Sequence, residues 1–244
     1  MRPAETASLA AEAYAVVRQR IARGELVLGQ AVSRRQLAAE LGMSFLPVTE
    51  ALLRLEFEGL LESRPRAGTR VRIPSRQDVE GTYIVREALE TQAALLFAEV
   101  ATDAERSELR RLAARVDALS TKSDRSMYVT LHLKLHHRIA ECTQCDALRE
   151  AIERTHAMAM IWFCVMRTPS PDDSPRRHQD LVEEILTGDP MRIGAAVREH
   201  LAVGRRHTLE LLEPYFKTGS RRFSRIVPVR PTCPPSPKAS AGPP

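Results

Sequence analysis

The histidines are the residues of this chain best suited to chemistry, and they all lie in its second half. All seven fall between His132 and His207. His132 and His136 are four residues apart, so a helix would carry both on one face, whereas His137, about 100° further round, would face elsewhere. Imidazole is a good metal ligand, although a lone histidine on an apolar face is usually structural. This spacing indicates a candidate site in the second half of the chain.

Charge is distributed unevenly along the 244 residues, whose formal net charge is +5. Residues 1–76 hold 12 basic and 8 acidic side chains, and residues 77–216 hold 18 and 23. A basic segment followed by an acidic body suggests a module that binds a polyanion, joined to a unit that need not touch it. We therefore expect two sites with different chemistry.

The composition excludes several classes of protein. Only 5% of the residues are aromatic, which favours a helical protein rich in Leu and Ala over an aromatic-rich β-sandwich. The longest apolar run, residues 157–166, is too short to cross a bilayer, and Glu5 and Glu12 interrupt any signal sequence. The four cysteines form no disulfide framework. We expect a reduced, cytoplasmic protein without a membrane partner.

The first third of the chain predicts a winged helix. Ser33 can cap a short helix that ends at Gly42, and Ser44 can cap the next helix almost immediately. Two short helices joined by so tight a turn form a helix-turn-helix. A strand, a basic turn and a second strand follow between residues 60 and 73. We therefore assign residues 1–74 to a DNA-binding domain whose wing is a small β-hairpin.

The remainder predicts a helical bundle and a tail. Beyond Pro74, residues 75–216 contain start signals for about six helices and none for strands. Residues 217–244 include seven prolines and six basic residues but no acidic one, which is typical of a disordered segment. The tail either adds weak, salt-sensitive attraction to DNA or has no role.

Several motifs resemble one family of regulators. The segment Gly42-Met-Ser-Phe-Leu-Pro-Val-Thr-Glu-Ala-Leu52 is similar to the signature of GntR-type transcription regulators, and residues 59–69 fit their wing. The segment Arg86-Glu-Ala-Leu-Glu90, and Gly188-Asp189 followed by His200, resemble the helical FCD effector domain of the FadR branch. The resemblance covers roughly residues 8–215. It implies a mainly α protein, with an N-terminal winged helix-turn-helix, a C-terminal all-α effector and dimerisation domain, and a homodimer on double-stranded DNA.

The resemblance also implies which residues contact DNA. The recognition helix presents its first residues to base edges, but Phe45 and Thr49 stand where the family commonly has Arg, so the operator should differ from that of relatives. Phe45 and Leu46 can pack on a thymine methyl group, or alternatively be buried against the wing or the effector domain. The expected DNA-binding residues are Arg34, Arg35, Ser44, Phe45, Leu46, Pro47, Thr49, Arg66 and Gly68.

For one large group of FCD domains, the resemblance implies a divalent metal held by three histidines and an Asp four residues before the first of them. Carried over, the ligands are His136, His178 and His200, and His132 occupies the Asp position. A neutral four-His site would favour zinc or nickel over a harder ion. Alternatively, His132 does not bind the metal and leaves a position open to water or effector.

Effectors of FCD domains are often small carboxylates bound beside the metal. Arg86 is the candidate partner for such a carboxylate, because a guanidinium can bind it with two hydrogen bonds. The alternative is an ion pair between Arg86 and Glu90, one helical turn away.

Three functions are consistent with these residues. The first is a repressor released by a metabolite and bound to a palindromic operator. The second is a regulator for which zinc or nickel is itself the signal. The third is a metal-dependent hydrolase, against which we note that no Asp or Glu in a catalytic motif accompanies the histidines. We expect a regulator and not an enzyme.

Overall fold

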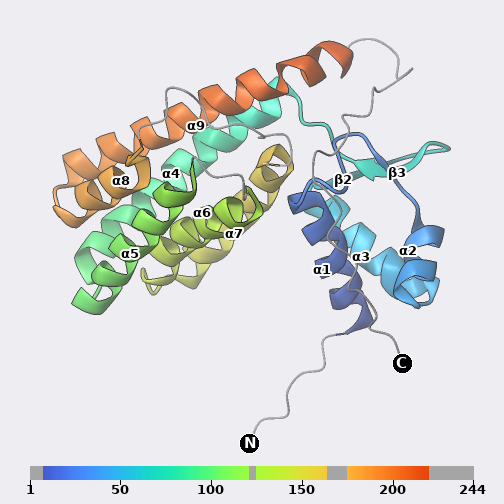
Figure 1. The fold of residues 1–244 in the computed structure, drawn as a ribbon, viewed down its shortest axis with the longest axis horizontal. Helices are drawn as coiled ribbons and strands as arrows, with labels where there is room; N and C mark the ends of the chain where they lie inside the picture. Colours follow the sequence, from blue (N-terminus) through green and yellow to red (C-terminus); the bar gives the residue numbers. More distant parts are fainter. Residues whose placement is uncertain (1–7, 121–124, 164–174, 220–244) are drawn as a thin grey trace, which may run out of the picture.

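The computed structural model describes residues 8–120, 125–163 and 175–219. Two parts are visible in Figure 1: a small α/β unit built by the first third of the chain, and a bundle of helices that follows it. The fold class predicted from the sequence is confirmed. None of the described helices has the length and apolar character that a membrane span requires.

The α/β unit is a winged helix. Its elements are α1 (Leu9–Ala22), β1 (Ala31–Val32), α2 (Arg34–Leu41), α3 (Phe45–Phe57), β2 (Leu61–Arg64) and β3 (Gly68–Val71). Ser33 caps α2 by accepting a hydrogen bond from the backbone of Gln36 at 3.3 Å. Gly42 ends α2 with a φ of 63°, in the left-handed region that favours glycine. Ser44 lies at the predicted N-cap of α3, but its side chain makes no capping hydrogen bond.

The sheet has one strand more than the predicted hairpin. Its order is β1-β3-β2, and both pairings are antiparallel. β1 pairs Ala31 with Arg70 and Val32 with Thr69. A strand of two residues has no alternation that a sequence pattern could reveal. The wing is therefore anchored to the segment just before the helix-turn-helix.

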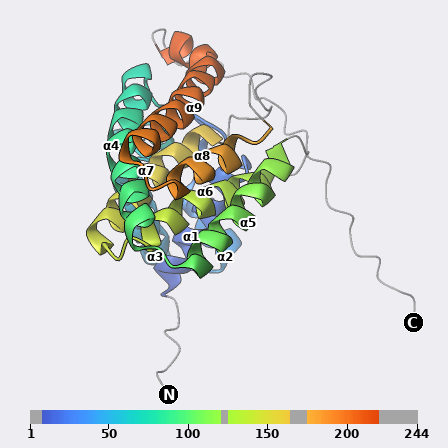
Figure 2. The same cartoon turned by 90° about the vertical axis from the view of Figure 1, so that its left-hand side faces the viewer.

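In the described residues beyond 74, the bundle consists of six helices, as predicted, and no strand occurs there. They are α4 (Arg76–Val100), α5 (Asp103–Ser120), α6 (Arg125–Glu141), α7 (Asp146–Phe163), α8 (Arg177–Leu186) and α9 (Pro190–Gly219). The two longest, α4 and α9, pack side by side, as both views show (Figures 1 and 2). α9 continues past the predicted tail boundary at residue 216, and the tail from residue 220 lies outside the described residues.

Two helix starts depend on local capping that the sequence makes visible. Ser75 and Asp78 form a reciprocal capping box at the start of α4. Thr102 and Glu105 do the same before α5, where each side chain accepts a hydrogen bond from the backbone N–H of the other, at 3.3 and 3.0 Å. These caps fix the entry of the chain into the bundle.

Candidate functional site

Four buried histidines from three helices meet inside the bundle. His132 and His136 come from α6, His178 from the first turn of α8, and His200 from α9. Their ring centroids are separated by 4.7 Å for the closest pair, His132 and His136, and by 6.4 Å for His132 and His200. The structure thus brings together all four residues of the predicted metal site, which we call the histidine chamber.

Asp117 on α5 fixes the orientation of His178. The Nδ1 atom of His178 lies 2.6 Å from Oδ1 of Asp117 and donates a hydrogen bond to it. The same carboxylate accepts hydrogen bonds from the backbone N–H groups of His178 and Gln179 at 3.1 and 2.9 Å. The lone pair of His178 is therefore on Nε2, which faces Nδ1 of His132 at 3.0 Å.

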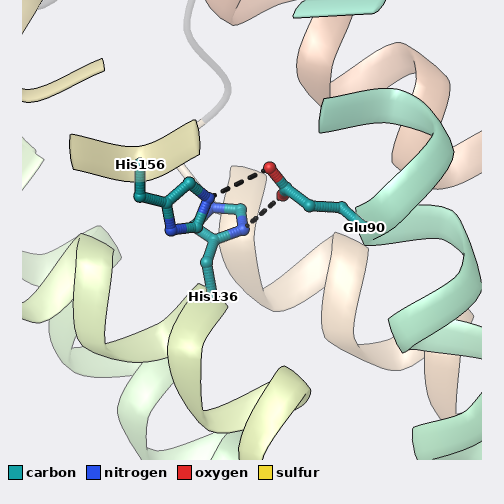
Figure 3. A group of neighbouring side chains, drawn as sticks. All are labelled: Glu90, His136 and His156. Carbon is teal, nitrogen blue, oxygen red and sulfur yellow. Dashed lines mark hydrogen bonds and ion pairs between the residues drawn. The ribbon is translucent and has the colours of Figure 1, made fainter. Parts of the chain in front are cut away.

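Glu90 on α4 performs the same role for His136. Its Oε2 atom lies 2.8 Å from Nδ1 of His136, and its Oε1 atom lies 3.1 Å from Nε2 of His156 on α7 (Figure 3). Arg86, one turn earlier on α4, donates from Nε to Oε1 of Glu90 at 2.7 Å. This buried carboxylate therefore joins a guanidinium to two imidazoles.

Electrostatics keep Glu90 ionised. Burial alone would raise the pKa of Glu90, but the charge of Arg86 and the hydrogen bonds from His136 and His156 hold it well below its usual range. Burial opposes the charge on Arg86, yet the facing Glu90 raises the pKa of Arg86 above its ordinary value. The pair is a buried salt bridge in which both members are charged.

Burial keeps four histidines of this region neutral, namely His132, His156, His178 and His200. It lowers the pKa of His132 and His200 far below the ordinary value, and that of His178 to a smaller extent because Asp117 opposes the shift. Burial also lowers the pKa of His156 to about 3. Neutral imidazole is the form that binds a metal, so this environment suits ligation.

Two ring nitrogens in the chamber are buried without a hydrogen-bond partner among the described residues. They are Nε2 of His136 and Nδ1 of His200. A buried polar atom without a partner costs about 1–3 kcal/mol, so such atoms usually have a ligand or water that completes them. The donors available are imidazole nitrogens, which match zinc or nickel. The predicted residues therefore fit a divalent metal.

Glu90, His136 and His156 form a second group whose donor atoms all lie within 4.8 Å of one another. The guanidinium of Arg86 already neutralises this carboxylate at 2.7 Å and would repel a second cation. Metal-bound histidines commonly donate their other N–H to a carboxylate, which fixes the ring. We therefore assign Glu90 and Asp117 to the orientation of His136 and His178.

A small cavity adjoins the histidine chamber. A cavity of about 10 Å³ is lined by Glu90, His136, His200 and apolar side chains of the bundle. This volume accommodates about one water molecule or ion. A carboxylate metabolite would require the helices to separate or Glu90 to move.

The contacts of Arg86 and of the histidines bear on two of our expectations. For Arg86, the structure shows the ion pair with Glu90 that we gave as the alternative, and the side chain is only 4% exposed. The sequence showed no Asp or Glu in a catalytic motif near the histidines, but the structure places two carboxylates, Glu90 and Asp117, in contact with them. Neither of them is available as a free base in this arrangement, since each accepts several hydrogen bonds.

The residues expected to contact DNA lie on α2, at the start of α3 and in the wing. Phe45 and Leu46 are 58% and 67% exposed, so they are not buried against the wing or the bundle. Arg34 and Arg35 on α2 and Ser44 are exposed, and Pro47 is partly exposed. Thr49 is partly exposed, but its hydroxyl donates to the carbonyl of Phe45 at 2.7 Å. In the wing, exposed Arg66 and Gly68 have φ values of 64° and 75° in the tight turn.

Sequence reasoning missed three members of the histidine network. Asp117 carries no local signal, because it lies 61 residues before His178. His156 stands alone in the sequence, without a second histidine at helical spacing. Glu90 was visible only as a partner of Arg86. Its contacts with His136 and His156 depend on the packing of α4 against α6 and α7.

Two family descriptions match this chain. Residues 9–71 match "Bacterial regulatory proteins, gntR family", and residues 82–203 match "FCD domain". These ranges coincide with the winged helix and with most of the bundle.

Relatives and solved structures agree with these matches. The chain is 30% identical over 183 residues to a "Probable D-xylose utilization operon transcriptional repressor" of Paenarthrobacter nicotinovorans, with 75% of this chain and 80% of the relative covered. It is 21% identical to the "HTH-type transcriptional repressor RspR" of Escherichia coli, with 77% of this chain and 83% of the relative covered. The structure of a "putative transcriptional regulator GntR" from Rhodococcus sp. RHA1 has the same fold, with a TM-score of 0.72 and 21% identity. The match covers 83% of this chain and 98% of that one. The structure of Escherichia coli McbR/YncC matches with a TM-score of 0.67 and 21% identity, and the match covers 85% of this chain and 99% of that one.

Proposed function

Because the chain belongs to the GntR family of transcription regulators and carries an FCD domain, we propose that it represses transcription by binding a near-palindromic operator as a homodimer. The observation that carries the proposal is the combination of an exposed recognition helix with a buried histidine chamber in the second domain. The first part would bind DNA in the cytoplasm, and the second would control that binding.

The exposed residues of the winged helix support sequence-specific binding. Phe45 and Leu46 offer apolar contact to thymine methyl groups in the major groove. Arg35 and Arg66 supply charge for phosphates or for the minor groove at the edge of the site. One recognition helix reads only a few base pairs, so discrimination within a genome requires two copies.

The histidine chamber would hold a divalent metal, with zinc favoured over nickel because zinc readily takes four nitrogen ligands. His136, His178 and His200 would be the ligands, and His132 would either join them or keep its hydrogen bond to His178. Since these residues come from α6, α8 and α9, a bound metal would hold three helices in one arrangement. It would supply a Lewis-acidic centre for an anionic effector.

A small carboxylate beside the metal and Arg86 remains the proposed signal for release from DNA. Arg86 can receive it only when Glu90 moves, because Glu90 occupies the guanidinium in this arrangement. Effector binding would then favour a state of the dimer with a different spacing of its winged helices.

One observation favours a second candidate, in which the metal is itself the signal. The cavity lined by His136 and His200 measures about 10 Å³, which is room for about one ion and not for a metabolite. In this case zinc or nickel alone would change the affinity for DNA.

Two measurements test the proposal. Genome-wide footprinting of the untagged protein should reveal paired half-sites, and an absence of any preferred duplex would contradict the assignment as a regulator. Elemental analysis of the same protein should find about one zinc or nickel per chain, and an absence of metal even after reconstitution would remove the metal site only. A reversible effect of zinc on operator binding without any carboxylate would favour the second candidate.

A further inference from the structure

A cleft of about 710 Å³ lies between the winged helix and the bundle. One wall comes from α1, the carboxyl end of α3 and the segment after β3, and the other comes from α6 and α7. Cavities that bind small molecules typically measure about 300–1,000 Å³ and often lie between domains. The cavity lined by His136 and His200, at about 10 Å³, is far below that range, whereas the cleft falls within it.

We propose that this cleft binds a small organic anion with an apolar or aromatic body. No residue of the histidine chamber lines it. The cleft is therefore distinct from the proposed metal site, and ligand binding in the cleft does not depend on a metal. Only its effect on DNA binding rests on the proposed function.

The charge of the lining favours an anion. Four arginines face the cleft, namely Arg18 on α1, Arg54 on α3, Arg72 after β3 and Arg154 on α7. Two of the three lining glutamates are already engaged. Glu58 accepts hydrogen bonds from Tyr14 at 2.7 Å and from Arg54 at 3.1 Å, and Glu153 accepts one from Arg149 at 2.9 Å. The third, Glu150, is exposed on α7.

Polar atoms without partners are found on the same walls. Nε of Arg18 and Nε2 of His137 are buried and make no hydrogen bond within the described residues. Arg72, in contrast, contacts Asp78 at 3.0 Å, which keeps its guanidinium in place. Since Arg18 comes from the first domain and His137 from the second, a carboxylate or phosphate between them would link the two domains.

Aromatic surface supplies a place for the body of the ligand. Phe57, the last residue of α3, is 91% exposed although it lines the cleft. Tyr14 faces the same space, and the guanidinium of Arg54 lies 4.0 Å from its ring centroid. Covering a side chain as large and exposed as Phe57 with an apolar group lowers the free energy, because apolar surface is removed from water.

The position of the cleft gives the ligand a direct effect on the recognition helix. α3 begins at Phe45, which faces DNA in our proposal, and ends at Phe57 in the cleft. A ligand that contacts both walls would fix α3 relative to the bundle. It would thereby select one spacing of the two recognition helices in the dimer.

Calorimetric titration of the full-length protein tests the site directly. The probes are phthalate and phenyl phosphate, with benzyl alcohol as the uncharged control. We expect both anions to bind at least about tenfold more tightly than benzyl alcohol, and the tighter of the two identifies carboxylate or phosphate as the preferred group. No binding of either anion at millimolar concentration would overturn the proposal.

Matched variants locate the binding site. Arg18→Gln and Arg154→Gln, one in each wall, should each weaken anion binding by about tenfold. Arg111→Gln, at an exposed position of α5 outside the lining, should leave it unchanged. Because Arg154 is exposed, its substitution should not disturb folding, which thermal unfolding of each variant verifies.

His200→Gln separates this proposal from the metal site. If the cleft is the site, this variant loses metal but binds phthalate as the wild type does. If His200→Gln abolishes anion binding while Arg18→Gln and Arg154→Gln retain it, the ligand enters the chamber and the present proposal is wrong. Protein that binds the anions in the cleft but holds no metal would contradict the metal site alone.

Discussion

His178 and Asp117 are joined by a short hydrogen bond, 2.6 Å between Nδ1 and Oδ1. The carboxylate on α5 thereby directs Nε2 of a histidine on α8 into the chamber. Glu90 on α4 directs His136 on α6 in the same way, at 2.8 Å. With His156 on α7 and His200 on α9, every helix of the bundle contributes to one buried polar network.

Substitution of Asp117 by Asn should weaken zinc binding by about 10- to 100-fold, which is the usual effect of removing a carboxylate that orients a metal-bound histidine. The amide no longer enforces the tautomer of His178 that places the lone pair on Nε2. Competition with a chromophoric chelator measures the change. Asp103→Asn, at an exposed position of the same helix, is the control and should bind zinc normally. Equal zinc affinity in both variants would show that Asp117 does not orient a ligand.

Substitution of Arg86 by Met should lower the free energy of unfolding by about 3–5 kcal/mol, because it leaves the charge of Glu90 buried without its cation. The double substitution Arg86→Met with Glu90→Gln should recover part of this loss, since the uncompensated charge is gone. Urea unfolding at neutral pH with a chelator present measures both. Arg110→Met removes the exposed ion pair with Glu183 and should cost less than about 1 kcal/mol. A loss for Arg86→Met as small as this would contradict the buried salt bridge.

The free energy of unfolding should decrease as the pH falls below about 6.5. The unfolded chain then binds a proton at His156, whereas the folded protein does not, because burial lowers the folded-state pKa of His156 to about 3. The stabilisation is complete above the unfolded pKa and decreases by up to about 1.4 kcal/mol per pH unit for each such histidine. His132, His178 and His200 act in the same direction.

Urea unfolding at several pH values between 7.5 and 5, with a chelator present, measures this dependence. Below pH 6.5, the slope of the unfolding free energy against pH reports how many protons the chain takes up on unfolding. This number should be lower by about one in His156→Gln than in the wild type. Parallel curves for the two proteins would indicate that His156 is protonated in the folded state.

Substitution of Arg35 or Arg66 by Ala should weaken operator binding. If each contacts a phosphate, each variant should also reduce the dependence of log K on log salt concentration by about one unit. Electrophoretic mobility shifts at several salt concentrations, on the operator found by footprinting, measure both quantities. Arg111→Ala on α5 serves as the control for a loss of charge away from the winged helix. Unchanged affinity in both variants would remove these residues from the DNA interface.

The sequence by itself determined the elements, because the interactions that define them are local. The capping pair of Ser75 and Asp78 spans three residues, and Gly42 ends α2 through its own backbone conformation. Spacing alone also placed His132 and His136 on one face of α6, and the family resemblance added His178 and His200. The two-residue strand β1 escaped prediction because it is too short to show a pattern.

Only the tertiary structure decided which groups surround those histidines. Asp117 reaches His178, and Glu90 reaches His156 across 66 residues, because helices pack in an order that no local pattern specifies. The spacing of Arg86 and Glu90 already allowed their ion pair, but only the packing of the helices buried it inside the bundle, where the absence of water makes the pair strong. Local residue order controls hydrogen bonds within a turn of helix, whereas burial and charge pairing depend on distant segments meeting in space.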